Sequence, residues 1–265
     1  MNKLKTQTTV RRPFVLSGGG ARGYAHLGVL KAFSECNIYP EAIAATSAGS
    51  IAAAFICDGY SADEVRAIFR EHKLGLSMQW KNWRAGFLSL KKVEEVLQHT
   101  LRHKTFEELE IPLFVSATNF LNGNQTIFQE GPLIPAILAA SSVPLLFPPI
   151  EIEGIQYVDG GLSGNLPIEP LLADYQGTIG VHVNPLTPYN PATGLFANVE
   201  RTLNLIMQEP VLKSKKLCSY FVEPTGLGKY GIFEFNRLED IYTTGLEYTQ
   251  KLLQQTPFPV IVSHS

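Results

Sequence analysis

The chain has 265 residues, of which 45% are hydrophobic and 17% charged, so it can bury a large core as one α/β domain. Its formal net charge of −2 at pH 7 gives no basic footprint for nucleic acid, which is excluded as an expected partner. The three cysteines lack metal-type spacing, so we expect neither a metal site nor a disulfide framework.

We expect residues 1–12 to form a flexible N-terminal arm and residues 13–265 to form a single domain. The arm is polar and basic, and no apolar core of signal-peptide length follows it. No window approaches the roughly 18 apolar residues that a transmembrane helix needs. The sequence therefore predicts a cytoplasmic protein whose contact with a membrane surface is at most transient and peripheral.

Apolar runs rich in β-branched and aromatic residues alternate along the chain with segments of helical periodicity. The predicted strands are Phe14 to Leu16, Ala42 to Ala45, Leu113 to Ala117, Gln156 to Val158, Thr178 to Val183 and Tyr220 to Val222. The predicted helices are Gly23 to Glu35, Ala48 to Asp58, Ala62 to Glu71, Lys91 to Leu101, Leu133 to Ala139, Glu169 to Ala173, Val199 to Leu217 and Glu239 to Gln255. This alternation predicts a largely parallel sheet covered by helices.

The segment from Leu74 to Ser89 has weak periodicity and contains both tryptophans, Trp80 and Trp83. It has two interpretations. One is a packed loop, or short helices, over the core. The other is a mobile cap that meets an acyl chain or a lipid surface.

A glycine-rich loop follows the first predicted strand and opens the first predicted helix. Its glycines let another group approach the backbone closely, and the first turn of a helix has unpaired N–H donors. We therefore expect an anion at this loop. It is either a bound phosphate, as in the dinucleotide pattern Gly18-x-Gly20-x-x-Gly23, or an oxyanion that exists only during a reaction.

The second predicted strand argues against a dinucleotide. Such a site needs an acidic residue at the carboxyl end of that strand, about 20 residues on, to hold the ribose hydroxyls. Glu41 has nearly the right offset, but it precedes the run from Ala42 to Ala45 and so lies at the wrong end. A nucleotide-binding module stays the least favoured alternative.

Ser47 lies at the junction between the second predicted strand and the next helix. Ala45, Thr46, Ala48 and Gly49 give this junction the composition of a nucleophile elbow, whose tight turn needs small residues two before and two after the serine. Ala45 stands where the Gly-x-Ser-x-Gly pattern has its first glycine. The alternative is a serine that only caps the helix.

The glycine loop and Ser47 are both expected at the carboxyl ends of strands, where ligands bind in open α/β sheets. The amides of Gly19 and Gly20 could then donate to the oxygen of an attacked carbonyl. Three roles of Arg22 are alternatives: its side chain holds the loop by hydrogen bonds to carbonyls, reaches a substrate phosphate, or lies exposed to solvent.

Asp159 is the strongest candidate for the base that a serine nucleophile needs. It ends a short apolar run, and a carboxylate at a strand end could accept the Ser47 proton directly. With an unperturbed pKa of about 4, it needs burial to raise its proton affinity. The alternatives are a simple Asp-Gly turn and a histidine base, for which His26 and His182 are the candidates.

Three segments resemble the patatin-like phospholipase family in sequence, order and spacing: Gly18 to Gly23, Ala45 to Gly49, and Asp159-Gly160-Gly161. Further similarity covers Ala139 to Pro144, Phe147 to Pro149 and Asn165 to Pro167. The resemblance extends from about Phe14 to Val183. It implies a three-layer α/β/α fold and hydrolysis of lipid acyl esters through a Ser-Asp dyad, with no metal or other cofactor.

Carried over residue by residue, the resemblance implies that Ser47 is the nucleophile and Asp159 the proton acceptor. The implied oxyanion hole is Gly18, Gly19, Gly20, Ala21, Arg22 and Gly23. Because Ala45 departs from the family glycine, a catalytically silent lipid-binding or regulatory protein is the alternative. The sequence does not indicate the head group, the acyl-chain length or the oligomeric state.

Overall fold

The computed structural model describes residues 9–72, 90–188, 195–256 and 258. Within these residues, one eight-stranded sheet has the order β5-β6-β3-β2-β1-β7-β8, and β4 also pairs with β3. The strands are β1 (Val10–Leu16), β2 (Ile38–Thr46), β3 (Leu113–Asn119), β4 (Gln125–Phe128), β5 (Ile150–Ile152), β6 (Ile155–Asp159), β7 (Ile179–Val181) and β8 (Tyr220–Val222).

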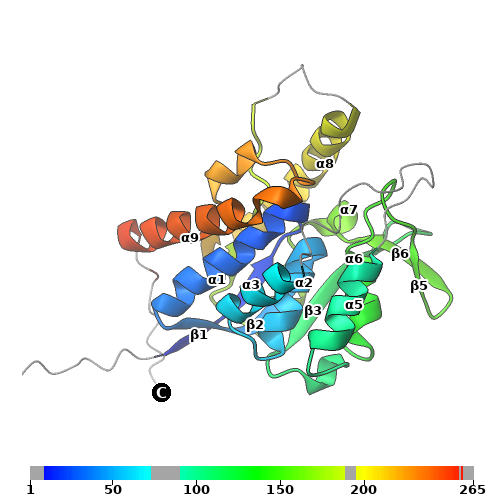
Figure 1. Ribbon diagram of the computed structural model, residues 1–265, viewed down its shortest axis with the longest axis horizontal. Helices are drawn as coiled ribbons and strands as arrows, with labels where there is room; N and C mark the ends of the chain where they lie inside the picture. The colour runs from blue at the N-terminus through cyan, green and yellow to red at the C-terminus, as the bar shows by residue number, and fades with distance from the viewer. Residues whose placement is uncertain (1–8, 73–89, 189–194, 257, 259–265) are drawn as a thin grey trace, which may run out of the picture.

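Helices cover this sheet (Figure 1). The α-helices are α1 (Ala25–Glu35), α2 (Ser47–Cys57), α3 (Ala62–Glu71), α5 (Lys91–Thr100), α6 (Leu133–Ala140), α7 (Gly161–Gly164), α8 (Leu195–Leu217) and α9 (Leu238–Gln255). The 3₁₀ helices are η1 (Gly20–Tyr24), η3 (Phe106–Glu108), η4 (Glu169–Leu171), η5 (Thr225–Lys229) and η6 (Phe235–Arg237). The helix predicted from Glu169 to Ala173 is therefore only the short η4.

Most of the sheet is parallel. The row β3-β2-β1-β7-β8 is parallel throughout, whereas β4, β5 and β6 pair antiparallel. The predicted largely parallel sheet and its six predicted strands are confirmed. β4 and β5 were not predicted, because both are short, partly exposed and contain polar residues.

β1 is longer than predicted at its N-terminal end. Val10–Arg12 pair in register with Ile38–Pro40 of β2, so these last three residues of the expected arm belong to the sheet. On the other side of β1, β7 pairs with Phe14–Leu16 and not with the residues before them. In the part of the chain that is described, the first residues of β1 thus have a strand on one side only, and their charged side chains need not enter the core.

Alternate residues of the central strands enter two separate cores, because successive side chains of a strand point to opposite faces. Phe14 and Ile43 pack with the buried sides of α1, α2, α5, α6 and α9. Val15 and Ala44 pack into a smaller core that includes Val211 of α8. The three-layer α/β/α fold is confirmed.

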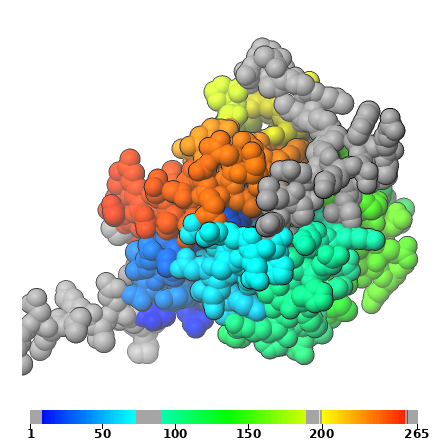
Figure 2. Space-filling model, in the orientation of Figure 1, coloured from blue at the N-terminus to red at the C-terminus, as the bar shows by residue number. Residues whose placement is uncertain are grey.

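α9 lies beside α1 in the larger helical layer (Figure 1). Gly28 of α1 makes the close approach possible, since a Cβ there would lie 2.2 Å from the carbonyl oxygen of Tyr242. In the space-filling view the cyan surface of α3 touches the orange surface near the start of α9, where Arg66 pairs with Glu239 (Figure 2). These contacts fix the C-terminal segment against α1 and α3.

None of the described helices combines the length and apolar character that a membrane-spanning segment requires. The segment from Leu74 to Ser89, for which a packed loop and a mobile cap were the two interpretations, lies outside the described residues, as do residues 1–8 of the expected arm.

Candidate active site

Two strands that run toward each other bring Ser47 and Asp159 together. β2 ends at Thr46, which pairs with Ser116 of β3, and β6 ends at Asp159, which pairs with the next β3 residue, Ala117. β4 pairs with both of these β3 residues from the opposite side. β2 and β6 therefore share one side of β3 and meet end to end, with Ser47 next to Asp159.

Ser47 has a strained backbone. Its φ of 49° lies in the left-handed region that residues other than glycine rarely adopt. Thr46 before it is extended, so the chain turns sharply from β2 into α2 at the serine. Such strain persists only where the surrounding structure enforces it, and it is a property of nucleophile elbows.

The small neighbours of Ser47 allow this turn. A Cβ at Gly49 would lie 2.5 Å from the Ser17 carbonyl oxygen, so only glycine fits there without displacement. Ala45 is fully buried in β2, and its methyl group packs into the larger core. The departure from the family glycine is thus accommodated by the sheet.

Asp159 is buried, with 4% of its surface exposed. Its Oδ1 accepts a hydrogen bond from the Gly161 amide at 2.8 Å. Its Oδ2 is buried and has no well-formed hydrogen bond within the described part of the chain. The carboxylate thus has one oxygen held by the backbone and one available to a reacting group.

Burial raises the pKa of Asp159 from 3.8 to about 6, and the Ser47 hydroxyl and the Gly161 amide oppose part of that rise. The hydroxyl therefore lies close enough to interact with the carboxylate, although the contact is looser than a full hydrogen bond. A carboxylate with this pKa is ionised at neutral pH and holds a proton more strongly than an exposed aspartate.

The glycine after Asp159 closes the junction between the strands. A Cβ at Gly160 would lie 2.1 Å from the carbonyl oxygen of Ser116 and 2.4 Å from Oγ1 of Thr46. That threonine hydroxyl donates to the same Ser116 carbonyl at 2.9 Å. The absence of a side chain at Gly160 lets β6 reach the end of β2.

The glycine loop packs directly against the serine. A Cβ at Gly18 would lie 2.9 Å from Cβ of Ser47, and a Cβ at Gly23 would lie 2.4 Å from Cβ of Ala48. Gly20 has a φ of 54°, and a Cβ there would lie 2.3 Å from the carbonyl oxygen of Ile232. Only glycine therefore lets this loop pass between the elbow and the C-terminal segment.

Several amides of the loop already have acceptors. The Gly18 amide donates to Oδ1 of Asn165 at 3.0 Å, and the Ala21 amide donates to the Ile232 carbonyl at 2.8 Å. The Arg22 amide donates to the Gly19 carbonyl at 3.0 Å. The amides of Gly19 and Gly20 have no acceptor among the described residues, so they can donate to a ligand.

Arg22 holds the loop. Its buried guanidinium donates through Nε to the Tyr230 carbonyl at 2.6 Å and through Nη2 to Oε1 of Glu200 at 2.7 Å. Nη1 donates to Oδ1 of Asn184 at 3.5 Å. The first of the three alternatives for Arg22 is therefore confirmed, and the exposed alternative is wrong, because the side chain is 5% exposed.

Ser17, directly before the loop, and Asn184, three residues after β7, support the loop. Oγ of Ser17 donates to the Gly18 carbonyl at 2.9 Å and accepts from the Val183 amide at 3.1 Å. Nδ2 of Asn184 donates to the Gly18 carbonyl at 2.8 Å. Sequence reasoning missed Asn165 and Asn184 as site residues; only the stretch containing Asn165 carried any signal, through its likeness to the family.

The two candidate histidines have other partners. Nε2 of His26 donates to the Ser17 carbonyl at 2.8 Å, and burial lowers the pKa of this ring to about 4, so it is neutral. Nδ1 of His182 lies 2.9 Å from Oε1 of Glu223. Neither ring is hydrogen-bonded to Ser47 or Asp159 in the part of the chain that is described.

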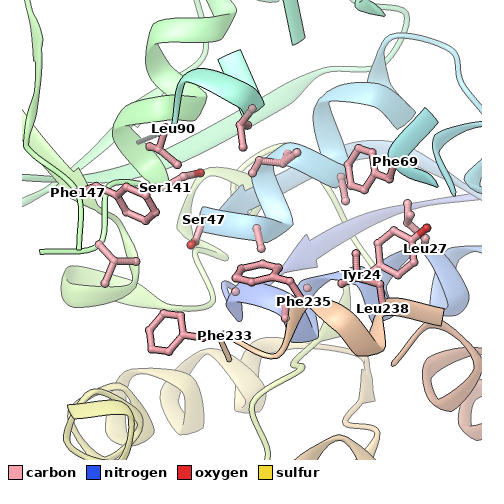
Figure 3. Close-up of a pocket in the computed structure, with 18 residues that line it drawn as sticks. Tyr24, Leu27, Ser47, Phe69, Leu90, Ser141, Phe147, Phe233, Phe235 and Leu238 are labelled. Carbon is pink, nitrogen blue, oxygen red and sulfur yellow. The ribbon is translucent and has the colours of Figure 1, made fainter. Parts of the chain in front are cut away.

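An almost entirely apolar pocket leads away from Ser47 (Figure 3). Ser47, at the start of α2, lies between Phe147 on one side and Phe235 and Phe69 on the other. Its larger apolar lining residues are Tyr24, Leu27, Ile51, Phe69, Leu90, Phe147, Phe233, Phe235 and Leu238. This space can hold a hydrocarbon chain.

A smaller cavity also borders Ser47. It is lined by Ser47, Asp159, Asn165 and Asn184, together with Met207 of α8 and other residues. Ser47 thus borders an apolar pocket and a cavity with several polar groups.

Across the described residues, no group of three or more His, Cys, Asp or Glu side chains could hold a metal ion.

The sequence is similar to a known family and to several known proteins. The model of the family described as patatin-like phospholipase matches residues 14–172. An uncharacterized NTE family protein of Mycobacterium tuberculosis is 32% identical over 168 residues, which cover 62% of this chain and 29% of that protein. Lysophospholipase NTE1 of Pyricularia oryzae is 28% identical over 291 residues, which cover 93% of this chain and 19% of that protein. The chain thus spans less than a third of the length of either relative.

The fold is also that of a solved structure. VipD from Legionella pneumophila superposes with a TM-score of 0.53 at 16% sequence identity, covering 92% of this chain and 67% of that one. At this identity the likeness concerns the fold alone.

Proposed function

Because the chain belongs to the patatin-like phospholipase family, we propose that it is a serine hydrolase that cleaves carboxylic ester bonds of lipids. Ser47 is the nucleophile, and Asp159 is the base, without a histidine. The observation that carries this proposal is the position of the strained Ser47 beside the buried carboxylate of Asp159.

In the first half of the reaction, Oγ of Ser47 attacks the ester carbonyl carbon, and its proton passes to Oδ2 of Asp159. The carbonyl oxygen becomes an oxyanion, to which the amides of Gly19 and Gly20 donate. In a measured protease, one such donor contributes roughly 3 to 4 kcal/mol to catalysis. The bond to the leaving oxygen then breaks, and Asp159 returns the proton to that oxygen.

In the second half, a water molecule attacks the acyl-Ser47 carbonyl and gives its proton to Asp159. The same two amides stabilise the second oxyanion. The bond to Oγ of Ser47 breaks, the proton returns to this oxygen, and a carboxylic acid leaves. A pKa of about 6 suits Asp159 to both steps, because it must accept and release a proton in each half.

The two spaces beside Ser47 support a division of the substrate. The fatty acyl chain occupies the apolar pocket, where its burial is favourable. The alcohol or lysolipid leaves through the cavity lined by Asp159 and Asn165. Similarity to a protein named as a lysophospholipase makes a lysophospholipid the first natural substrate to test.

Transient contact with a lipid surface is also part of the proposal. Leu145 is 74% exposed and has a φ of 72°, so it projects from a tight turn. Val143 and Pro144, just before it, line the cavity beside Ser47. An exposed leucine at this position can enter the lipid interface next to the site.

The test is hydrolysis of a p-nitrophenyl acyl ester series and of lysophosphatidylcholine, by the wild type, Ser47→Ala and Ser219→Ala. Ser219 is an exposed serine outside the site and serves as the matched control. We expect turnover by the wild type and the control, and loss of turnover in Ser47→Ala. Lipid binding without turnover by the wild type would instead support the silent lipid-binding alternative.

A further inference from the structure

Asn165 places an unused hydrogen-bond donor beside the proposed catalytic pair. The residue directly follows α7 and is 1% exposed. Its Oδ1 accepts from the Gly18 amide at 3.0 Å, which fixes the orientation of the side-chain amide, because an N–H needs an oxygen acceptor. Its Nδ2 is buried and has no acceptor anywhere in the described ranges.

The side chain of Asn165 lies between the glycine loop, the serine and the aspartate. A Cβ built on Gly18 would lie 2.7 Å from Oδ1 of Asn165 and 3.6 Å from Oγ of Ser47. A Cβ built on Gly161 would lie 2.9 Å from Oδ1 of Asp159 and 3.1 Å from Oδ1 of Asn165. Ser47, Asp159 and Asn165 also line the same cavity.

This cavity therefore contains one donor, Nδ2 of Asn165, that has no partner among the described residues, and one acceptor, Oδ2 of Asp159, that has no well-formed hydrogen bond there. A buried polar atom that lacks a full hydrogen bond destabilises the protein. We therefore expect each of these two atoms to interact with an atom of the ligand. An oxygen that accepts from an N–H and exchanges a proton with a carboxylate satisfies both. The leaving oxygen of an ester and the oxygen of an attacking water have this property.

We propose that Asn165 is a further catalytic residue, whose Nδ2 donates a hydrogen bond to the leaving-group oxygen and then to the oxygen of the attacking water. This inference rests on the proposed ester hydrolysis. In the first half-reaction, the carbon–oxygen bond to the leaving group breaks, and its electron pair goes to the leaving oxygen. Asp159 delivers the proton to that oxygen while Nδ2 stabilises its developing negative charge.

The same position serves the second half-reaction, because the attack of water is the chemical reverse of the departure of an alcohol. The water oxygen accepts from Nδ2 of Asn165 and gives a proton to Asp159 as its bond to the acyl carbon forms. Nδ2 thus orients the water toward the carbonyl.

A second role of Asn165 must be separated from this one, since its Oδ1 also ties down the Gly18 amide. Asn184 offers a matched control. It holds the same residue through its Nδ2, which donates to the Gly18 carbonyl, and it lines the same cavity, so its Nδ2 already has an acceptor in the fold. Loss of a hydrogen bond to Gly18 disturbs the loop and lowers the rate for every substrate. Loss of the donor to the leaving group lowers the rate most when the leaving group is poor.

The test measures kcat/KM for two esters with the same acyl chain, a p-nitrophenyl ester and a glyceryl ester, whose leaving groups are good and poor. For Asn165→Ala we expect a loss at least ~10-fold larger with the glyceryl ester than with the p-nitrophenyl ester. Asn165→Asp keeps an oxygen that can accept from the Gly18 amide and replaces the donor by a carboxylate oxygen, so it covers the case in which the alanine variant fails to fold. The added charge raises the pKa of the neighbouring Asp159 and slows both esters. The comparison of the two esters within this variant removes that common loss, and the same ratio is expected. Asn184→Ala is expected to lower both rates by equal factors.

Equal losses with both esters in the Asn165 variants, as in Asn184→Ala, would overturn the role of Asn165 while wild-type turnover and its dependence on Ser47 stood. If the wild type hydrolysed neither ester, the proposed function itself would fail, and the inference with it.

Discussion

Ser47 follows the last residue of β2, Asp159 is the last residue of β6, and the two strands approach each other along one side of β3. The level at which they meet is set by hydrogen-bond register, which ties Thr46 to Ser116 and Asp159 to Ala117. The backbone of the sheet therefore positions the proposed nucleophile and base, without a histidine between them.

The pH dependence of hydrolysis follows from the raised pKa of Asp159. A base works only when deprotonated, so kcat/KM is expected to fall as the pH drops through about 6, approaching tenfold per unit at lower pH. The measurement is a pH–rate profile with an ester stable between pH 4 and 8. A profile that stays flat down to pH 4 would contradict Asp159 as the titrating base.

Asp159→Asn is expected to abolish turnover and yet stabilise the fold at neutral pH. The pKa is higher in the folded state than in the unfolded chain, so burying the ionised form opposes folding above pH 6. Removing the charge therefore raises the free energy of unfolding by up to about 3 kcal/mol at pH 7, and the gain shrinks as the pH falls toward 4. Urea denaturation of the wild type and the variant at pH 7 and at pH 4.5 measures the gain in stability at each pH.

Asp174→Asn, at an exposed position, is the control for that substitution and is expected to change stability little. A loss of stability in Asp159→Asn at pH 7 would contradict the buried, ionised carboxylate.

Gly20→Ala is expected to disable the glycine loop. Its Cβ would lie 2.3 Å from the Ile232 carbonyl oxygen, and the φ of 54° disfavours any side chain. We expect a loss of kcat/KM of about a hundredfold, as for removal of an oxyanion donor.

Gly123 provides the control for this substitution. It also has a positive φ, but a Cβ there meets nothing within 4 Å. Gly123→Ala is therefore expected to cost about 1 kcal/mol of stability and no activity. Similar activities in the two variants would argue against the loop's role.

Ile51→Trp is expected to shorten the preferred acyl chain. Ile51 lies on α2 about one turn beyond Ser47 and lines the apolar pocket, so a larger side chain narrows the space for the chain. Hydrolysis of a decanoyl p-nitrophenyl ester should fall about tenfold or more, while hydrolysis of the acetyl ester stays within about twofold. Leu212→Trp, at an exposed position on α8, should affect neither ester. Equal losses for both chain lengths would place the acyl chain elsewhere.

The sequence predicted those parts of the site that local patterns encode. Ser47, Asp159 and the glycine loop each sit at a strand end, and small residues mark each turn. The residues that hold the loop from the C-terminal part of the chain have no such local signal. Arg22 bonds to Glu200 and Tyr230, and Ala21 bonds to Ile232, across about 180 to 210 positions of sequence. Only the packing of the C-terminal segment brings them to the loop.

The direction of β6 was also beyond local patterns. The sequence of a strand that ends in Asp-Gly-Gly is compatible with a parallel or an antiparallel direction. Only the pairing with β3 determines that β6 is antiparallel. From the sequence, the amides of Gly19 and Gly20 were expected to donate to the oxyanion, whereas the family resemblance implied the whole loop from Gly18 to Gly23. The structure leaves only two of the loop's first amides, those of Gly19 and Gly20, without an acceptor among the described residues.

The most direct test of the Ser47–Asp159 pair is covalent labelling by a fluorophosphonate, followed by mass spectrometry of the peptide that contains Ser47. The account predicts one adduct per chain, located on Ser47, absent in Ser47→Ala and formed far more slowly in Asp159→Asn. Labelling of another residue, or unchanged labelling in Asp159→Asn, would contradict it.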